Sequence, residues 1–164
     1  MTASYIPVSQ GKYTTIVDSD LFDFLSQWNW RLISGYASRS QKYRDENGKM
    51  KKKTIRMHSV INKTPQGMVT DHINGDKLDN RTSNLRSATR QQNQWNRKPG
   101  KNSITGIKGV SWCSQTNKWR VCITVNKSRK TIGFHNCIGK AINHYNEFAK
   151  EYHGEFARLN KRSA

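Results

Sequence analysis

Acidic residues and cysteines are scarce in this 164-residue sequence, and long hydrophobic runs are missing. Only 11 Asp and Glu stand against 29 Lys and Arg, so the formal net charge is +18. Such an excess favours a polyanionic partner, nucleic acid first, although a solvated basic face or an anionic membrane surface would also account for it. No apolar run approaches the ~20 residues that a membrane-spanning helix needs, so we expect no membrane partner.

The few cysteines exclude one common kind of metal site. Cys113, Cys122 and Cys137 form no CxxC pair, and three cysteines cannot supply a four-cysteine zinc site. Their odd number and the lack of a signal peptide favour a reducing cytoplasm.

The length of the chain, together with one stretch that contains residues unfavourable for helix and strand, predicts two small domains. Residues 97–105 contain a Pro-Gly pair and three basic residues but almost nothing apolar, which is typical of a linker. Both sides are basic, with a net of +7 over 1–96 and +11 over 97–164. Before the linker we expect short strands, a hairpin turn at Asn47-Gly48, and helices over 57–62 and about 90–97. Lys51 to Lys53 fit a solvated edge or a phosphate contact equally well.

The segment after the linker has clear periodicity. Apolar and polar residues alternate from Trp119 to Asn126, which predicts a half-buried strand, and Ile132 and Phe134 are expected to continue its apolar face. An apolar stripe at helical spacing runs from Ile138 to Tyr152, and Gly154 is well placed to end that helix. We therefore expect three antiparallel strands with one helix packed on their apolar face, which leaves the opposite face open for a ligand.

Asp71, His72, Asn84 and Asn93 together offer the groups that phosphodiester hydrolysis requires. A histidine near its ordinary pKa can act as general base, and carboxylate and amide oxygens suit a hard divalent cation that neutralises charge at the phosphate. A second Asn can hold the imidazole in its working tautomer. The same residues lie in a stretch rich in Asn, Asp and Gly, so they also fit an ordinary turn.

The spacing of these residues resembles the HNH endonuclease family, in particular the phage and intron-encoded branch with the pattern DHxxGxxxDNRxxNL. The residues that carry the resemblance are Met57-His58, Asp71-His72-Ile73-Asn74-Gly75-Asp76, Leu78-Asp79-Asn80-Arg81, Ser83-Asn84-Leu85-Arg86 and Gln91-Gln92-Asn93. It implies a ββα-metal (His-Me finger) nuclease core over 57–97, with residues 1–56 as a β-rich N-terminal extension of the nuclease domain.

The resemblance also implies a role for each of the four site residues. His72 would be the general base, Asn84 would orient it, and Asp71 and Asn93 would hold one metal ion. Asn93 stands where the family name expects His, which favours Mg²⁺ or Mn²⁺ over softer metals. Related sequences often read Met-His-Arg where this chain has Met57-His58-Ser59, and if that Arg contacts phosphate, its absence weakens binding or cleavage here. His58 itself fits a structural hydrogen bond or a chemical role.

A second resemblance covers residues 104–160, after the linker at 98–105. The residues that carry it are Gly106 to Trp112, Lys118-Trp119-Arg120, Ile132-Gly133-Phe134, Ala141 to Tyr145 and Phe156 to Asn160. They resemble the AP2/ERF-type DNA-binding domain, whose sheet enters the major groove, and this implies such a domain over 106–164. The positions that match the contact face are Lys108, Ser111, Arg120, Thr124, Arg129 and Thr131.

These patterns predict an α+β protein with two modules: a ββα-metal nuclease and a three-stranded antiparallel sheet with one packed helix. We expect a metal-dependent, site-directed endonuclease of the homing type that cuts double-stranded DNA as a monomer or weak dimer. The open face of the second sheet is expected to carry no aromatic residue, which favours duplex DNA over RNA. A non-catalytic DNA-binding regulator derived from such a nuclease, and a basic RNA-binding protein, remain alternatives.

Overall fold

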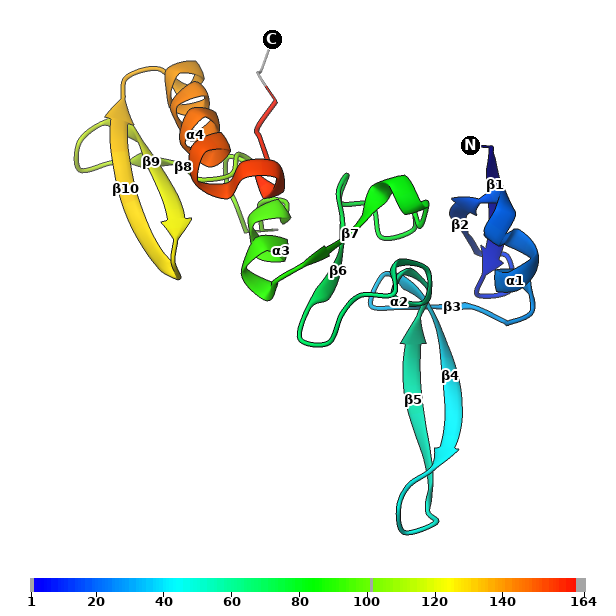
Figure 1. Ribbon diagram of the computed structural model, residues 1–164. Coiled ribbons are helices and arrows are strands. Elements are labelled where there is room, and N and C mark those ends of the chain that lie inside the picture. Colours follow the sequence, from blue (N-terminus) through cyan, green and yellow to red (C-terminus); the bar gives the residue numbers. More distant parts are fainter. Residues whose placement is uncertain (1, 101, 162–164) are drawn as a thin grey trace. The chain divides into compact units, whose positions relative to one another are not determined.

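The computed structural model describes residues 2–100 and 102–161, and these form two compact units, Met1–Thr89 and Arg90–Ala164. The mixed α and β character that the sequence predicts is confirmed by small antiparallel sheets and few helices (Figure 1). Residue 101 of the predicted linker, and residues 1 and 162–164 of the outer predicted domains, lie outside the described residues. In the described part, no helix is long and apolar enough to cross a membrane.

Unit 1 consists of three small sheets and two short helices. Strands β1 (Ala3–Val8) and β2 (Tyr13–Asp18) form a hairpin, followed by a 3-10 turn, η1 (Ser19–Leu21), and helix α1 (Phe22–Ser26). Strands β3 (Arg31–Ile33), β4 (Tyr36–Arg44) and β5 (Met50–Arg56) form the second sheet, and α2 (Met57–Asn62) follows it. Strands β6 (Val69–His72) and β7 (Leu85–Ala88) form the third, with the 3-10 turn η2 (Thr82–Asn84) before β7.

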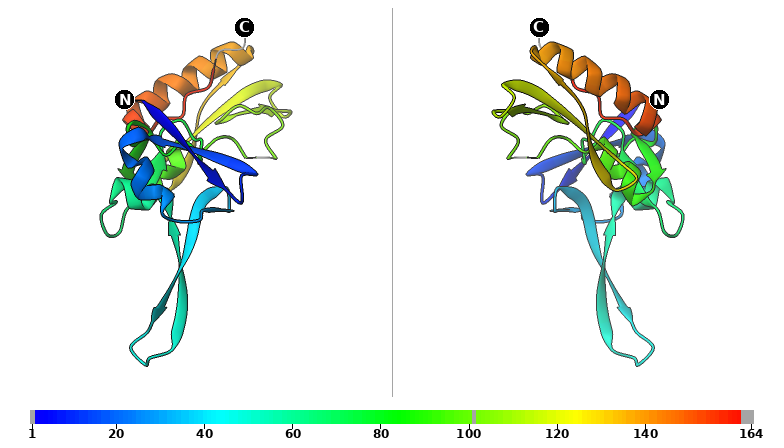
Figure 2. Two further views of the ribbon diagram at one scale, coloured as in Figure 1. Left: turned by 90° about the vertical axis from the view of Figure 1, so that its right-hand side faces the viewer. Right: turned by 90° about the vertical axis from the view of Figure 1, so that its left-hand side faces the viewer.

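The core of unit 1 joins the N-terminal segment to the predicted nuclease segment. Val8, Val17, Leu25 and Met57 are fully buried in one cluster, and burial of such side chains is worth about 1.5–3 kcal/mol each. Beyond this core, β4 and β5 continue as a two-stranded ribbon that extends away from the rest of unit 1 in all three views (Figures 1 and 2). The predicted turn at Asn47-Gly48 is confirmed: Gly48 has a φ of 74° and lies between the two strands.

Unit 2 has the predicted sheet and helix. Strands β8 (Val110–Cys113), β9 (Lys118–Val125) and β10 (Ser128–His135) form an antiparallel sheet with β9 in the centre. Helix α4 (Ile138–His153) lies along one face of this sheet (Figure 2), where Tyr145 and Ala149 pack on Val121 and Ile123. The helix ends at Gly154 as predicted, and a 3-10 turn, η3 (Gly154–Phe156), follows.

Helix α3 (Arg90–Asn96) belongs to unit 2, whereas the sequence places it in the nuclease core over 57–97. Within unit 2 the helix contacts η3, and the ring of Trp95 stacks on the ring of His153 with their centroids 4.4 Å apart. The compact units thus divide before the predicted linker at 98–105.

Candidate functional site

His72 is the last residue of β6 and lies at the mouth of the loop that connects β6 to β7. The loop returns on itself, because the Ile73 backbone N–H donates to the Asn84 carbonyl (2.9 Å) and the Gly75 N–H donates to the His72 carbonyl (2.8 Å). The register of the two strands places His72 opposite Leu85 and Asp71 opposite Arg86. The paired strands β6 and β7 therefore carry both Asp71 and His72 to the same end of the sheet.

The imidazole of His72 is buried, with 5% of the residue exposed, and is held by an amide that the sequence analysis did not single out. Its Nε2 lies 3.1 Å from Oδ1 of Asn80. The Asn80 amide in turn donates from Nδ2 to Oγ1 of Thr15 (2.7 Å), and the Thr15 hydroxyl donates to the Leu78 carbonyl (2.6 Å). Thr15 comes from β2, 65 residues earlier in the chain than Asn80.

The direction of this hydrogen-bond chain fixes the tautomer of His72. A carbonyl only accepts, so the Thr15 proton is committed to Leu78 and the Thr15 oxygen must accept from the Asn80 amide nitrogen. The Asn80 oxygen then faces the imidazole, and only an Nε2–H can donate to it. Nδ1 consequently carries the lone pair, and this is the atom that a general base uses to take up a proton.

Burial lowers the pKa of His72, although the hydrogen bond to Asn80 and the charges of Asp71, Asp76 and Asp79 oppose the shift. His58 lies behind it, with the two rings edge to face and their centroids 5.0 Å apart. Burial lowers the pKa of His58 to about 3, and the charges of His72, Arg56 and Lys77 act in the same direction. Both rings are therefore neutral near pH 7, and His58 supports the His72 ring by packing.

Asn84 does not orient His72 as the resemblance implies. Its amide oxygen accepts from the Asn74 backbone N–H (3.0 Å), and its Nδ2 donates to Oδ1 of Asn74 (3.0 Å) and to the Asp79 carbonyl (2.8 Å). These bonds cross the β6–β7 loop and engage both the oxygen and the nitrogen of the Asn84 amide. Asn84 therefore shapes the loop, and Asn80 makes the contact with the imidazole.

Hydrogen bonds from backbone and side-chain groups fasten the same loop to the N-terminal hairpin. The Thr82 backbone N–H donates to Asp18 (2.8 Å), and Ile16 exchanges backbone hydrogen bonds with Leu78 and Asn80 (both 2.8 Å). Asp79 accepts from the Arg81 guanidinium at 2.8 and 2.6 Å, which lowers the pKa of Asp79 below its ordinary value. The predicted N-terminal extension is thus a structural part of the loop that holds His72.

Asp71 is 4% exposed, and its carboxylate is one of the two predicted metal ligands. Oδ2 accepts from Nε and Nη2 of Arg86, both at 2.9 Å. The other predicted ligand, Asn93, lies on α3 in unit 2. Among residues 2–100 and 102–161, no group of three or more His, Cys, Asp or Glu gathers in a metal-binding arrangement. Carboxylate and amide oxygens are hard donors of the kind that suit Mg²⁺ or Mn²⁺.

The predicted nucleic-acid face of unit 2 is brought together by the strand register. Ser111 pairs with Arg120, and Thr124 pairs with Arg129, so these four residues and Thr131 share the face away from α4. Arg129, Thr124 and Thr131 are exposed. The Nε of Arg120 and the Oγ of Ser111 are buried without a hydrogen-bond partner among the described residues, and such atoms are costly unless a ligand satisfies them.

One aromatic residue lies on this face, contrary to the expectation from sequence. A β-bulge between Thr131 and Gly133 shifts the register, so Phe134 pairs with Arg120 and joins the open face, where it is 45% exposed. Ile132 still packs against the core. A strict alternation of apolar and polar residues does not reveal an inserted residue. Because the face carries Phe134, the argument that a face without aromatic residues favours DNA over RNA does not hold for this sheet.

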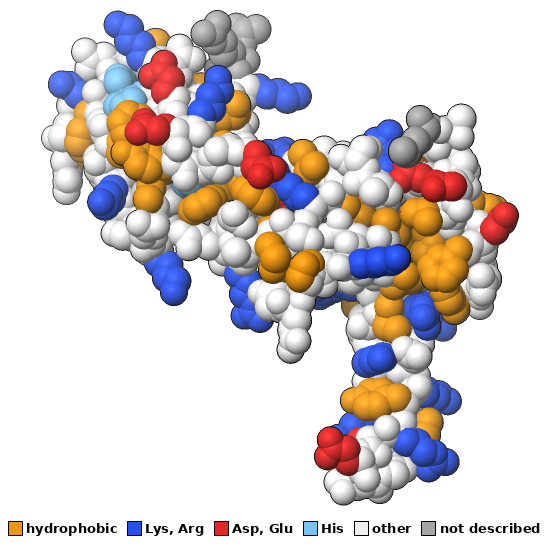
Figure 3. Space-filling model, viewed as in Figure 1, with side chains coloured by type: hydrophobic (Ala, Val, Ile, Leu, Met, Phe, Trp, Pro, Cys, Tyr) orange, Lys and Arg blue, Asp and Glu red, His pale blue; other side chains and the backbone are white. Residues whose placement is uncertain are grey.

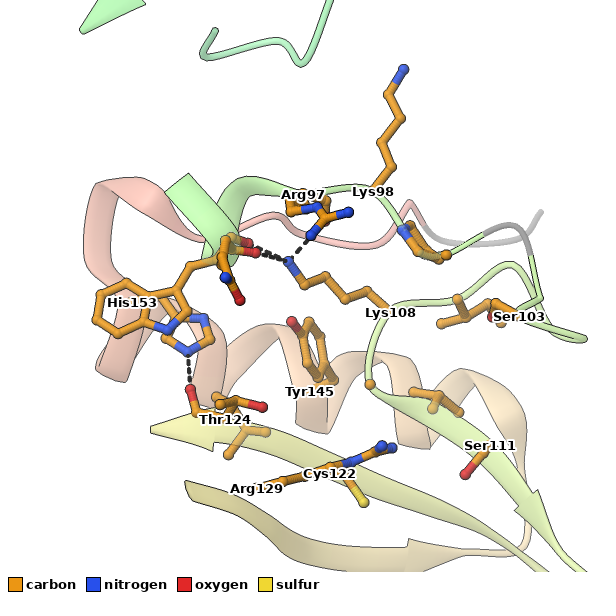
Figure 4. Close-up of a pocket in the computed structure, with 18 of the residues that line it drawn as sticks. Arg97, Lys98, Ser103, Lys108, Ser111, Cys122, Thr124, Arg129, Tyr145 and His153 are labelled. Carbon is orange, nitrogen blue, oxygen red and sulfur yellow. Dashed lines mark hydrogen bonds between the residues drawn. The ribbon is translucent and has the colours of Figure 1, made fainter. Parts of the chain in front are cut away.

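Lys108 does not lie free for a phosphate, although it matches the contact face in sequence. Its ammonium donates to three carbonyls at the end of α3, those of Gln94 (3.4 Å), Trp95 and Arg97 (2.8 Å). Figure 4 shows Lys108 next to Arg97 with dashed hydrogen bonds at its ammonium group. Burial lowers the pKa of Lys108 to about 8, and the charges of Arg158 and Arg97 contribute. The lysine therefore stabilises a helix C-terminus, where a positive charge is favourable.

A hollow of about 890 Å³ lies beside this lysine, within unit 2 (Figure 4). Among the described residues that line it, none is acidic. Its basic residues are Arg90, Arg97, Lys98, Lys108, Lys127 and Arg129. Thr124 and Arg129 of the open face also line the hollow, so basic surface continues from the hollow onto the sheet.

The chain matches known sequences over both halves. The family model described as "HNH endonuclease" matches residues 63–95. "Uncharacterized HNH endonuclease L560" of Acanthamoeba polyphaga mimivirus is 33% identical over 157 residues, which cover 94% of this chain and 79% of that protein. "Protein 3.8" of Escherichia phage T7 is 32% identical over 95 residues, 58% of this chain and 78% of that protein. No solved structure gives a significant match.

A buried histidine with a fixed tautomer, next to a carboxylate on a short hairpin, is the kind of site expected of a nuclease. The chain belongs to the HNH endonuclease family, as its similarity to the mimivirus protein along nearly its whole length shows. The family supports a nuclease whose substrate is DNA.

Proposed function

We propose that this protein is a metal-dependent, site-directed DNA endonuclease of the homing type, which hydrolyses phosphodiester bonds in duplex DNA. The observation that carries the proposal is the Leu78–Thr15–Asn80–His72 hydrogen-bond chain, which leaves the lone pair of His72 on Nδ1. A general base needs this arrangement, because the nitrogen that accepts the proton must be the one that carries the lone pair. The phage and viral relatives favour action inside an infected host cell.

In this proposal His72 acts as the general base. Nδ1 takes a proton from a water molecule as its oxygen attacks the phosphorus, and the bond from phosphorus to the 3′ oxygen breaks. The lowered pKa keeps the imidazole neutral and able to accept that proton near pH 7. Asn80 holds the ring through Nε2 and stabilises the imidazolium that forms.

Asp71 and Asn93 would hold the divalent cation, Mg²⁺ or Mn²⁺, because carboxylate and amide oxygens are the ligands that hard cations prefer. The cation supplies charge neutralisation at the phosphate and stabilises the leaving 3′ oxygen. Arg86 binds one oxygen of Asp71 and orients that carboxylate. Asn84 keeps the loop next to it in shape.

Unit 2 would locate the target site through the open face of its sheet, as an AP2/ERF-like domain does. Ser111, Arg120, Thr124, Arg129 and Thr131 form that face, and an antiparallel ribbon of this kind fits the major groove. Tethering the two units raises the effective concentration of the nuclease at the bound site.

The test is cleavage of supercoiled duplex DNA by the purified protein with Mg²⁺ or Mn²⁺. We expect the wild type to nick or cut the DNA and His72→Ala to lose at least 10²-fold in rate, since general-base catalysis contributes ~10²–10⁴. Binding to the same DNA should persist in that variant. Undiminished cutting by His72→Ala would show that His72 is not the base.

A DNA-binding regulator without catalysis is the second candidate. The observation that favours it is the Asp71–Arg86 ion pair, since Arg86 occupies one oxygen of the carboxylate that a metal ion would need. A wild-type protein that binds duplex DNA yet never nicks it with either metal ion would select this candidate over the nuclease.

A further inference from the structure

The ribbon formed by β4 and β5 carries the whole net charge of unit 1. Residues 36–56 contain eight Lys or Arg and two Asp or Glu, a net of +6, whereas residues 1–89 contain fourteen and eight, also a net of +6. The remainder of unit 1 is therefore neutral overall. Figure 3 shows Lys and Arg side chains along this projection.

The ribbon has no core of its own beyond its base. From Ser40 to Thr54 the residues are exposed on both faces, Asp45 alone being half-buried, although β4 and β5 stay paired up to Arg44 and Met50. An isolated two-stranded hairpin is marginally stable in water, so this extension adds little to the stability of unit 1. Binding to a partner explains this exposed extension better than a role in folding does.

The pairing of the strands makes the ribbon electrostatically unfavourable when it is alone. Lys42 lies directly opposite Lys52, and like charges at opposed positions destabilise a sheet. Lysines on an exposed edge also discourage unwanted strand pairing, but that purpose does not require two of them face to face. A polyanion lying along the ribbon would turn this repulsion into attraction.

Other basic residues of the ribbon already have internal contacts. Lys51 is 2.9 Å from Asp45 at the tip, and the guanidinium groups of Arg39 and Arg56 lie over the rings of Trp28 and Tyr36 at the base. Lys42 and Lys52, between tip and base, are exposed. They are the residues whose charge is best placed for an external partner.

We propose that the β4–β5 ribbon is a second DNA-binding surface, in the nuclease unit itself, and that it contacts the phosphates of duplex DNA through Lys42 and Lys52. This inference rests on the proposed function for its choice of duplex DNA as the partner. A two-stranded ribbon is narrow enough to enter the major groove, which is about 12 Å wide. Its contacts are to the backbone, so they add affinity without sequence preference.

The experiment compares two double variants of the full chain that lose the same charge. Lys42→Gln/Lys52→Gln removes the opposed pair, and Lys12→Gln/Lys63→Gln removes two exposed lysines of unit 1 outside the ribbon. Affinity for a short duplex is measured by fluorescence anisotropy without divalent metal, over a range of KCl concentrations. The expected result is a roughly tenfold loss for the ribbon variant near 0.1 M salt, and a salt slope lower by about 1.8, or 0.9 for each lost phosphate contact.

Thermal unfolding of the same proteins separates lost contact from lost fold. The ribbon variant should unfold no earlier than wild type, because the Lys42–Lys52 repulsion is gone. Equal losses of affinity in the two double variants, or an unchanged salt slope in the ribbon variant, would overturn the proposal. So would a ribbon-dependent loss seen on duplex RNA but not on duplex DNA at equal salt.

The outcome is independent of catalysis. If the ribbon variant loses DNA affinity but wild type never cleaves DNA with Mg²⁺ or Mn²⁺, the ribbon proposal stands and the nuclease proposal fails. If wild type cleaves DNA and the ribbon variant binds DNA as tightly as its control, the nuclease proposal stands and the ribbon proposal fails.

Discussion

The two units place their polar residues in opposite ways. Unit 1 buries a network of polar side chains around His72, and its net positive charge lies on the β4–β5 ribbon. Unit 2 has an apolar core between sheet and helix, and its polar residues lie on the open face and around the hollow. A reacting group needs a fixed, water-poor environment, whereas a surface that recognises a ligand must remain exposed. The difference agrees with the proposal that the general base lies in unit 1 and that the open sheet face of unit 2 contacts the target DNA.

The largest effect should come from Gly109, where unit 2 has no room for a side chain. This residue has a φ of +73°, and a Cβ there would lie 2.2 Å from the Tyr145 ring and 2.5 Å from the Cys122 carbonyl oxygen. Gly109→Ala combines backbone strain of about 1–2 kcal/mol with overpacking of about 1–3 kcal/mol. We expect a loss of stability of about 3 kcal/mol in unit 2, measured by hydrogen exchange of peptides from each unit.

Gly106→Ala is the matched control, because Gly106 also has a positive φ (+62°) but nothing lies within 4 Å of its added Cβ. It should cost about 1–2 kcal/mol, the backbone strain alone. Exchange in unit 1 should change in neither variant. If Gly109→Ala lowers protection from exchange equally in both units, the two units unfold together. They would then not be independent, and the comparison between them would fail.

Acid should destabilise unit 1 through the buried ring of His58, which is faced by His72, Arg56 and Lys77. Its pKa is about 3 in the folded chain, against 6.5 as its ordinary value, so the unfolded chain binds more protons between these limits. Stability is therefore complete above about pH 6.5 and falls as the pH is lowered, by up to about 1.4 kcal/mol per pH unit for this group.

The measurement is hydrogen exchange or urea unfolding of wild type and His58→Leu between pH 7 and pH 5. The profile of unit 1 should be flatter in the variant, and that of unit 2 should be the same in both proteins. Parallel pH profiles for unit 1 in wild type and variant would show that His58 is not the group that titrates.

A smaller effect, on rate rather than folding, should follow from breaking the tautomer lock. Asn80→Ala removes the partner of His72 Nε2, and loss of such supporting hydrogen bonds typically costs 10–100-fold in activity. Thr15→Val should reproduce part of this loss and Thr15→Ser should restore activity, because the serine hydroxyl can still accept from Asn80. The ¹⁵N chemical shifts of the His72 ring report the tautomer directly.

In wild type we expect the proton on Nε2 of His72, and in Asn80→Ala a mixture of tautomers. A ring that keeps its proton on Nε2 in Asn80→Ala while the rate falls would assign Asn80 a purely structural role. It would also weaken the distinction between a unit organised for catalysis and a unit organised for contact.

Features that depend on neighbouring residues were predictable from the sequence. The helix over 57–62, the Asn47-Gly48 turn, the central strand of unit 2 and the end of α4 at Gly154 all follow from local spacing, and all are confirmed. The placement of Asp71 and His72 at one end of a hairpin also follows the spacing of the HNH pattern.

Features that depend on distant partners were not predictable. Nothing near Thr15 in the sequence indicates that it meets Asn80, and the side chain of Asn84 is used by the loop instead of by His72. The inserted Ile132 turns Phe134 to the other face, and Lys108 serves the end of α3. Tertiary packing decides each of these outcomes, because it determines which atoms come within hydrogen-bond distance. Neither the alternation of apolar and polar residues nor the distribution of charge encodes that packing.

The contact between Thr15 and Asn80 also has a consequence for how the chain matures. Closing a loop of 65 residues is entropically more expensive than forming the local β6–β7 hairpin, so the hairpin can form well before its lock. The β1–β2 hairpin therefore lacks this contact until the loop around His72, which follows it in the chain, has been synthesised. Competence for hydrolysis would arise late in folding, as a property of the closed unit rather than of the HNH segment alone.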